Sequence, residues 1–405
     1  MMLRSLKIIF IFYTILLAPG CKLSDRDLLA PPSEVRSQIQ VEIAKWYDNH
    51  TGAVSVTYDH GAPHTPHNIN IENLVLQHGL TMDFELVTSE VMKDSVLISH
   101  IKNFMLPRGF GFFGHGHEHV NHDALSYDQS LASFSKCYES MTAMGLKPAA
   151  YAYPGGWGYH LSTRSALKDA GFLCGRRFEQ LDISDPYITP DSIDAPRDWY
   201  ALPSLVMQSI KYDGCVICIN NTEELLVYLR ETLNKTAWII LTYHDIGLEN
   251  EYGFYEAEDF EKDLKAIKSL DLWCDNISDI VLYIRERNNA SVSVELITDA
   301  SGYSSEIRIR LSDGLQNDFY NQPLTLLFDI PENWINRDLV LEGSNSLVSL
   351  RSDTEQIKIS VLPDEGVYVL KAGGRRSEVG SKKSESQDRH KFRKLAQMAG
   401  PCLRH

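Results

Sequence analysis

The sequence predicts an α/β protein with a mainly parallel sheet, followed by a small antiparallel β domain. Between residues 45 and 288, short apolar stretches alternate with stretches whose apolar residues recur at spacings of three and four, as in an amphipathic helix. That alternation is typical of a layer of parallel strands covered by helices. From residue 289 to 371, β-branched and alternating stretches are separated by Asp-Gly, Asn and Pro, which predict antiparallel strands joined by turns.

The elements of each part can be assigned in order. In the α/β part the candidate strands are 54–58, 82–87, 111–113, 149–153, 209–211 or 215–219, 238–243 and 272–274. The candidate helices there are 126–144, 162–170, 223–234 and 257–269. In the β domain the candidate strands are 292–296, 306–311, 324–328 and 357–361. The β domain could stabilise the first domain as a cap or could bind sugar, and the sequence leaves both roles open.

The N-terminus has the features of an export signal. Arg4 and Lys7 precede an apolar run over 8–18, which is shorter than a membrane-spanning helix requires. The sequence Leu-Ala-Pro-Gly-Cys that ends at Cys21 resembles the cleavage box of a bacterial lipoprotein. We therefore expect residues 1–21 to be a signal peptide or lipoprotein signal. The mature protein would be exported, either anchored to a membrane through a lipid on Cys21 or secreted.

Composition limits the remaining segments and the class of partner. The 405 residues are 43% apolar, which is enough for two globular domains. Residues 22–44 are polar with adjacent prolines and are expected to be a linker, and residues 372–405 to be a disordered basic tail. A net charge of -15 argues against a nucleic-acid partner. Cys215 and Cys218 are expected to be buried apolar side chains rather than zinc ligands.

Residues with reactive side chains follow the candidate strands. Asp59 and His60 come directly after strand 54–58, and His115 comes directly after strand 111–113. Active sites of β/α barrels lie at the C-terminal ends of the strands, so these side chains are expected to converge. His115 and His119 are four residues apart, a spacing that places both rings on one face of a helical turn. Three His ligands leave one tetrahedral position open for water, which is the catalytic arrangement of zinc.

The order of the motifs resembles that of the polysaccharide deacetylases, which are metal-dependent carbohydrate esterases. The stretches that carry the resemblance are Thr57-Tyr58-Asp59-His60-Gly61, His115-Gly116-His117-Glu118-His119, Ala152-Tyr153-Pro154-Gly155-Gly156 and Leu241-Thr242-Tyr243-His244. The resemblance covers roughly residues 50–288. It implies a distorted β/α barrel of the polysaccharide deacetylase type as a catalytic domain over 45–288, with 289–371 as an accessory β domain.

The resemblance also implies a role for each site residue. Asp59 would be the general base, His244 the general acid, and the backbone N–H of Tyr153 would hold the oxyanion. A divalent ion would be held by His60, His115 and His119. Zinc is favoured because His60 stands where the family has an Asp, and imidazole suits zinc better than a hard cation. The substrate would be an N-acetylated or O-acetylated polysaccharide or oligosaccharide, from which the enzyme removes acetyl groups.

Two departures from the family leave alternatives open. The Arg that steadies the base in the family is absent before Tyr153, and the nearest match to the fourth motif, 194–199, is one residue too long. Asp59 would then be oriented by another partner, or it would ligate the ion itself with His60 turned away. The chain could also be a catalytically impaired glycan-binding relative. An enzyme of the same fold that acts on C–N bonds of small molecules without a metal is a third reading, which His115 and His119 disfavour.

Overall fold

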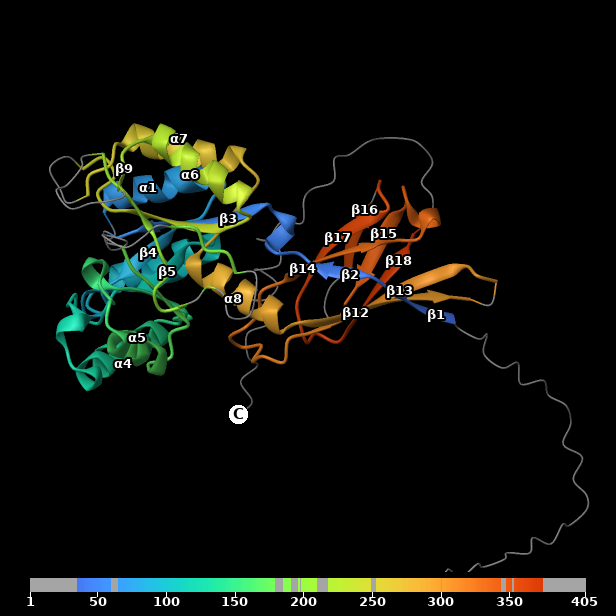
Figure 1. The fold of residues 1–405 in the computed structure, drawn as a ribbon, viewed down its shortest axis with the longest axis horizontal. Coiled ribbons are helices and arrows are strands. Elements are labelled where there is room, and N and C mark those ends of the chain that lie inside the picture. Colours follow the sequence, from blue (N-terminus) through green and yellow to red (C-terminus); the bar gives the residue numbers. More distant parts are fainter. Residues whose placement is uncertain are drawn as a thin grey trace, which may run out of the picture.

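The computed structural model describes most of the chain between residues 35 and 373. The described residues are 35–59, 65–178, 185–190, 196, 198–209, 218–248, 253–299, 301–343, 347–351 and 353–373. They form a curled parallel sheet surrounded by helices and, beside it, an antiparallel β domain (Figure 1). The predicted signal segment with Cys21, His60, and the predicted tail from 374 onward lie outside these residues. Within them, no helix combines the length and the apolar character that crossing a membrane requires.

The parallel sheet curls into a distorted barrel. In spatial order its strands are β7 (Cys174–Arg176), β6 (Ala150–Ala152), β5 (Gly111–Gly114), β4 (Asp83–Leu86), β3 (Gly52–Tyr58), β10 (Trp238–Tyr243), β8 (Leu205–Met207) and β9 (Cys218–Ile219). β11 (Leu272–Cys274) pairs with the first half of β3. A parallel bridge between Arg176 and Leu202 brings the chain just before β8 against β7, so the two sides of the sheet meet there. The predicted fold class, a distorted β/α barrel followed by an antiparallel β domain, is confirmed.

Strand β3 is central because both of its faces are buried. All of its residues are buried, as expected for a parallel strand covered on both sides. Val54, Val56 and Tyr58 pack into the apolar core beneath the helices. The hydroxyl of Thr57 lies on the opposite face and donates to the carbonyl of Leu241 at 3.0 Å. Because side chains two apart share a face of a strand, Asp59 follows Thr57 toward the inside of the barrel.

The helices cover the outside of this sheet. They are α1 (Pro66–Gln77), α2 (Thr88–Val91), α3 (Ser95–His100), α4 (Tyr127–Ala143), α5 (Leu161–Asp169), α6 (Thr222–Asn234), α7 (Ala257–Ser269) and α8 (Ile277–Asn289). Short helical turns are η1 (Tyr47–Asn49), η2 (Ile101–Met105), η3 (Leu106–Arg108), η4 (His122–Ala124), η5 (Pro154–Gly156) and η6 (Glu332–Trp334). The start of α4 is fixed by a capping box in which Ser126 and Gln129 each bind the other's backbone N–H.

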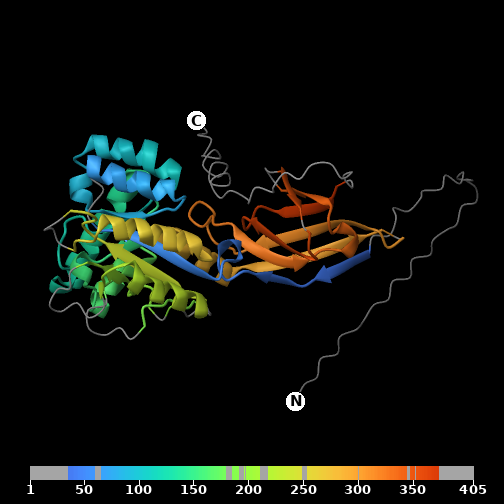
Figure 2. The same cartoon turned by 90° about the horizontal axis from the view of Figure 1, so that it is seen from above.

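The β domain consists of two antiparallel sheets. The larger contains, in order, β1 (Val35–Ile39), β12 (Ser291–Thr298), β13 (Ser304–Ser312), β18 (Val367–Ala372), β15 (Asp338–Glu342) and β16 (Leu347–Arg351). The smaller contains β17 (Gln356–Val361), β14 (Leu324–Asp329) and β2 (Val41–Ile43). Seen from above, β1 runs along one edge of the domain (Figure 2).

The N-terminal strands correct one predicted boundary. Residues 22–44 were expected to be a linker, but β1 pairs with β12 and β2 pairs with β14. The accessory domain is therefore built from both ends of the described chain. The physical reason is that β1 is an edge strand with mostly exposed side chains, joined through backbone hydrogen bonds that an apolar pattern does not reveal.

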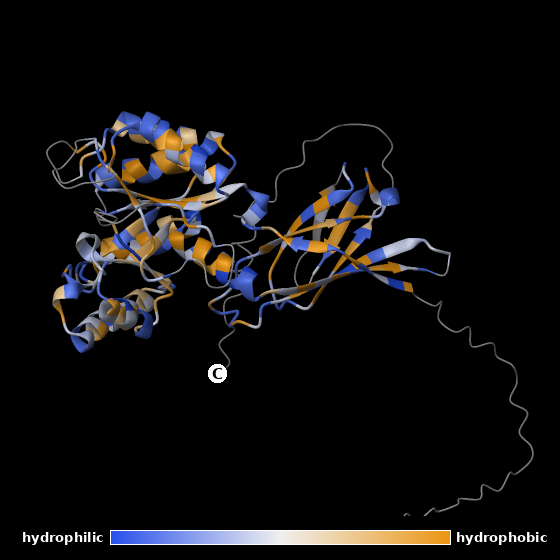
Figure 3. Cartoon of the chain, viewed as in Figure 1, coloured by the Kyte–Doolittle hydropathy of each residue, from blue (hydrophilic) through white to orange (hydrophobic). Residues whose placement is uncertain are grey.

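A shared core joins the two domains. One apolar cluster contains Trp273 and Tyr283 from the barrel side together with Leu326 and Ile359 of the β domain. The hydroxyl of Tyr283 on α8 donates to the carbonyl of Ala44 at 2.8 Å. Hydrophobic residues line the strands of both domains and recur along α8 (Figure 3). This continuity favours the stabilising role for the β domain.

Candidate active site

Asp59 directly follows the C-terminal end of β3, the central strand of the parallel sheet. Its backbone N–H donates to the carbonyl of Tyr243 at 2.8 Å, which extends the pairing of β3 with β10 by one residue. Its carboxylate oxygen Oδ2 is bound by the guanidinium of Arg176. The other oxygen, Oδ1, is buried and has no hydrogen-bond partner among the described residues. One acceptor of Asp59 is thus fixed and the other remains available.

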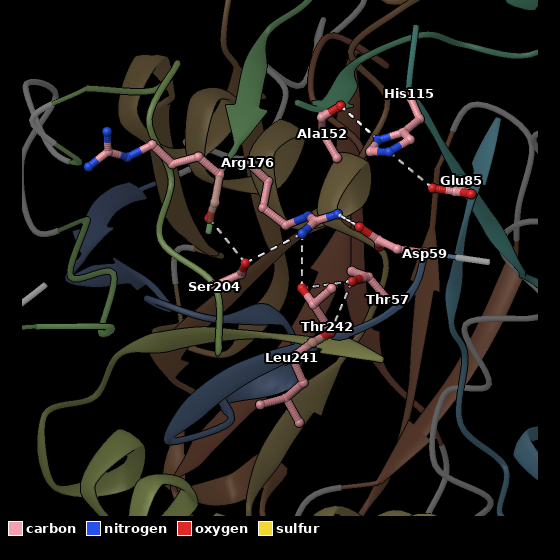
Figure 4. A network of polar contacts seen from close by, with 10 residues as sticks. Thr57, Asp59, Glu85, His115, Ala152, Arg176, Ser204, Leu241 and Thr242 are labelled. Atoms are coloured by element: carbon pink, nitrogen blue, oxygen red, sulfur yellow. Dashed lines mark hydrogen bonds and ion pairs between the residues drawn. The ribbon is translucent and has the colours of Figure 1, made fainter. Parts of the chain in front are cut away.

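Arg176 is the centre of a buried polar network that joins distant strands. It stands at the end of β7, and its side chain is only 1% exposed. Besides Asp59, the guanidinium donates to the hydroxyl of Thr242 at 3.0 Å and to that of Ser204 at 3.4 Å. The hydroxyl of Thr57 lies 3.2 Å from that of Thr242 and completes the network (Figure 4). A planar guanidinium with several donors suits this task better than a lysine would.

The charge on Arg176 decides the ionisation of Asp59. Burial alone would raise the pKa of the Asp59 carboxyl. The positive charge of the Arg176 guanidinium, which also binds this carboxylate, outweighs burial and holds this pKa below its ordinary value. Asp59 is therefore an ionised carboxylate at neutral pH, with one oxygen available as a proton acceptor.

His115 is held in one tautomer by strand β6. Its Nδ1 lies 3.0 Å from the carbonyl oxygen of Ala152, and because a carbonyl only accepts, Nδ1 carries the proton. Burial lowers the pKa of His115 to about 3, so the ring is neutral. The lone pair then lies on Nε2, which is 3.3 Å from a carboxylate oxygen of Glu85 on β4. Such a carbonyl partner is the usual way in which a metal-binding imidazole is oriented.

Asp59, Glu85 and His115 form a group that suits a divalent cation. One oxygen of each carboxylate and one ring nitrogen of His115 all lie within 4.8 Å of one another. Figure 4 shows the three side chains beside Arg176. The unpartnered Oδ1 of Asp59 and the buried Nε2 lone pair of the neutral His115 ring both require a positively charged or proton-donating ligand. Two carboxylates and an imidazole are ligands of the kind found in catalytic zinc sites.

The predicted pair His115 and His119 is close in space but not on a helical turn. Residues 115–119 form a bend after β5, so the expected helical spacing is wrong. The two rings are nevertheless adjacent, with centroids 4.9 Å apart, and His119 is exposed. His119 does not belong to the close group formed by Asp59, Glu85 and His115. His60, the third predicted ligand, lies outside the described residues.

The predicted oxyanion role of Tyr153 is corrected by its hydrogen bonds. Its backbone N–H donates to the carbonyl of Arg176 at 3.1 Å, as part of the pairing between β6 and β7. Its hydroxyl donates to the carbonyl of Tyr200 at 3.0 Å, and the side chain is buried. The N–H is therefore engaged within the sheet, and Tyr153 is a packing residue of the barrel.

His244 follows β10 and lies beside Asp59. It is buried, and its ring interacts electrostatically with the carboxyl of Asp59. Its ring centroid is 5.7 Å from that of Phe178. The backbone of Gly253 packs against this ring so closely that a Cβ there would lie 2.8 Å from the Cβ of His244. His244 is thus held in place beside Asp59, and its predicted role as general acid stays a prediction.

The nearest match to the fourth motif serves structural contacts. Asp198 accepts a hydrogen bond from Arg164 at 2.9 Å. The ring of Trp199 lies beneath the guanidinium of Arg285 on α8, at 5.0 Å. Asp194 lies outside the described residues.

Two important residues were missed by sequence reasoning. Glu85 was included in a candidate strand without a role, although an acidic residue near the end of a buried strand is itself a signal. Arg176 follows Cys174 and Gly175 at the end of a strand of three residues, and no apolar pattern marks so short a strand.

Comparisons with known proteins identify similar folds only. No protein-family model matches the chain, and no curated protein matches it. Among solved structures, a putative polysaccharide deacetylase from Mycobacterium smegmatis is 16% identical with a TM-score of 0.44, covering 62% of this chain and 95% of the other. A family 4 carbohydrate esterase from Streptomyces lividans in complex with acetate is 12% identical with a TM-score of 0.37, covering 57% and 95%. A family 4 pseudoenzyme from Bacillus anthracis is 13% identical with a TM-score of 0.38, covering 56% and 65%.

Proposed function

We propose that this protein is a metal-dependent hydrolase that removes acetyl groups from an acetylated glycan. The proposal rests on one observation: Asp59, which forms a buried ion pair with Arg176, lies in one close group with Glu85 and His115. This arrangement places an ionised carboxylate at a site for a divalent cation. The order of the motifs along the chain, which resembles that of the polysaccharide deacetylases, supports the substrate class.

The ion would be held by His115 through Nε2 and by the carboxylate of Glu85. His119, whose ring is adjacent to that of His115, would supply a further imidazole. His60 remains a predicted ligand. We propose zinc, because imidazoles and a carboxylate together form a common catalytic zinc site. When bound, the ion would polarise the acetyl carbonyl and lower the pKa of a water molecule.

The chain's own residues would move the protons. Asp59 accepts a proton from the attacking water through Oδ1, while Arg176 holds Oδ2 and keeps the carboxylate ionised. The water oxygen forms a bond to the acetyl carbon, and the bond from that carbon to nitrogen or oxygen of the sugar breaks. His244 donates a proton to the departing amine or alkoxide. The products are acetate and a sugar with a free amine or hydroxyl.

The proposed setting is outside the cytoplasm. Residues 1–21 are proposed to direct export, with Cys21 either carrying a lipid or removed with the signal. Cys218 takes part in a disulfide, and disulfides persist mainly in oxidising compartments. Cys218 is also buried, as expected from the sequence.

One observation favours a second candidate function. Because the N–H of Tyr153 is engaged with Arg176, the site lacks the oxyanion donor that the resemblance implies. A catalytically impaired relative that binds acetylated glycans would tolerate that loss. The two functions differ in turnover but share the proposed ion site.

The decisive experiment combines metal content with acetate release. The purified protein is analysed for bound metals and incubated with N-acetylglucosamine oligomers and with acetylated xylan. We expect about one divalent ion per chain and release of acetate, with both strongly reduced in Glu85→Gln and His115→Gln. The matched control is Glu90→Gln, which removes an exposed carboxylate on α2. Metal without acetate release would favour the glycan-binding relative, and a wild type that binds no divalent ion would overturn the proposed mechanism.

A further inference from the structure

Two aromatic side chains are exposed on the loop between η5 and α5. Trp157 is 38% exposed and Tyr159 is 43% exposed. Large aromatic side chains gain stability from burial, so an exposed pair on one short loop calls for a physical reason.

The backbone of this loop is clamped on both sides. The carboxylate of Asp123 accepts hydrogen bonds from the N–H groups of Gly158, Tyr159 and His160, at 2.9, 2.8 and 3.2 Å. The guanidinium of Arg164 donates to the carbonyls of Gly158 and Tyr159, at 2.6 and 3.2 Å. These bonds together fix the loop while leaving the two aromatic side chains outside. The loop is therefore preorganised, and binding a ligand there would cost little additional ordering.

Contacts on one side join the loop to the general acid. A Cβ at Gly155 would lie 3.1 Å from Nε1 of Trp157, so the indole lies across the backbone of η5. The next residue, Gly156, lies against the ring of Phe178, since a Cβ there would come within 2.2 Å of that ring. Phe178 in turn contacts His244, with ring centroids 5.7 Å apart.

On the other side, the loop contacts Arg177 and Asp123. The guanidinium of Arg177, the residue after the Arg176 that binds Asp59, lies 4.9 Å from the centre of the Tyr159 ring. Asp123 belongs to η4, the turn that follows His115 and His119 along the chain. The aromatic pair is thus linked to the site through Phe178, which contacts His244.

We propose that Trp157 and Tyr159 form a subsite for a pyranose ring of the glycan, next to the ring whose acetyl group is removed. This subsite rests on the proposed function and would hold the glycan beside the residues that remove the acetyl group. The faces of a pyranose carry C–H groups and its edges carry hydroxyls, so a flat aromatic surface binds the face while water solvates the edges. A net charge of -15 disfavours the other common ligands of exposed aromatic rings, the bases of nucleic acids.

Binding and kinetics on oligomers of graded length test the subsite. The probes are N-acetylglucosamine oligomers of one to six units and acetylated xylo-oligosaccharides, with binding measured by calorimetry and turnover by acetate release. For the longer oligomers, Trp157→Ala and Tyr159→Ala should each weaken binding and raise KM by about tenfold, with a smaller change in kcat. Trp157→Phe, which keeps an aromatic face, should restore much of the binding. Tyr303→Ala removes an equally exposed tyrosine in the β domain and should match the wild type.

The outcomes separate this inference from the proposed function. Tight binding of long oligomers by the wild type without acetate release, lost in Trp157→Ala, would support the subsite and refute the hydrolase. Acetate release by the wild type with an unchanged KM in Trp157→Ala and Tyr159→Ala would refute the subsite alone. A wild type that neither binds nor deacetylates any of the oligomers would refute both.

Discussion

Replacing Arg176 by methionine should damage both stability and catalysis, because this side chain neutralises the buried base. Methionine fills similar space but provides no charge and no donor. The change leaves Oδ2 of Asp59 without its ion-pair partner, and it removes donors from the hydroxyls of Thr242 and Ser204. Burial, which by itself raises the pKa of Asp59, would then no longer be offset by the guanidinium, so the pKa of the base would rise.

The structure sets the expected magnitude. The side chains of Arg176 and Asp59 are 1% and 2% exposed, so the pair is fully buried. Removing one member of a buried ion pair costs about 3–5 kcal/mol, because the other charge is left without compensation. Loss of a positioned general base lowers turnover by about 10²–10⁴-fold. Arg176→Met should therefore lose about 3–5 kcal/mol of unfolding free energy and most of its acetate release.

A double-mutant cycle distinguishes the ion pair from simple packing. Unfolding free energies are measured by urea denaturation for Arg176→Met, Asp59→Asn and the double variant. If the two charges depend on one another, the double variant should be less destabilised than the sum of the single variants by about 1–3 kcal/mol. Arg177→Met is the matched control, since the neighbouring Arg contacts Tyr159 instead. Strict additivity, or equal damage in the control, would refute the role assigned to Arg176.

Three further perturbations test the fold and the site. A Cβ at Gly111 would lie 2.0 Å from Oδ1 of Asp83, so Gly111→Ala should lower the unfolding free energy by about 1–3 kcal/mol and shift the urea midpoint, and an unchanged midpoint would contradict this packing. His244→Gln should reduce kcat by about 10²–10⁴-fold while metal content stays at the wild-type level, and loss of metal would show that His244 is a ligand. Burial raises the pKa of Glu286 to about 8, although the N–H of Gln322 donates to this carboxyl. Because the folded-state pKa lies above the ordinary value of 4.5, the stability from holding this proton is present below about pH 4.5 and is lost as the pH rises through 8. Wild-type stability should therefore fall relative to Glu286→Gln between pH 5.5 and 8.5, and parallel pH curves would exclude this effect.

The parts of the site that lie at strand ends could be predicted from the sequence. Asp59, His115 and His244 each directly follow a buried apolar strand, and such strands are long or apolar enough to recognise. In a parallel sheet those ends share one edge, so the convergence followed from local sequence alone. The structure brings Asp59 and His115 together and places His244 beside them.

The partners of these residues could not be predicted because they depend on how the sheet curls. Arg176 lies 117 residues from Asp59 along the chain, on a strand of three residues. Glu85 lies on β4, and its approach to His115 requires the register in which Glu85 pairs with Phe113. Neither the curl nor this register leaves a trace in the spacing of apolar residues. The edge strand β1 was missed for a related reason, since it joins the β domain through its backbone.

The apparent loss of the family's Arg is better explained as a displacement by one strand. The resemblance predicts an Arg at the position of Ala152, and Ala152 and Arg176 are directly paired in the register of β6 and β7. The backbone of Arg176 on β7 is therefore level with that of Ala152 along the strands and lies about 4.8 Å from it, the distance between neighbouring strands. An arginine side chain is long enough to span this distance. Ala152 meanwhile orients His115 through its carbonyl. Adjacent strands therefore orient the base and the imidazole separately, so the missing Arg no longer argues for an impaired relative. The altered fourth motif and the engaged N–H of Tyr153 remain for activity measurements to decide.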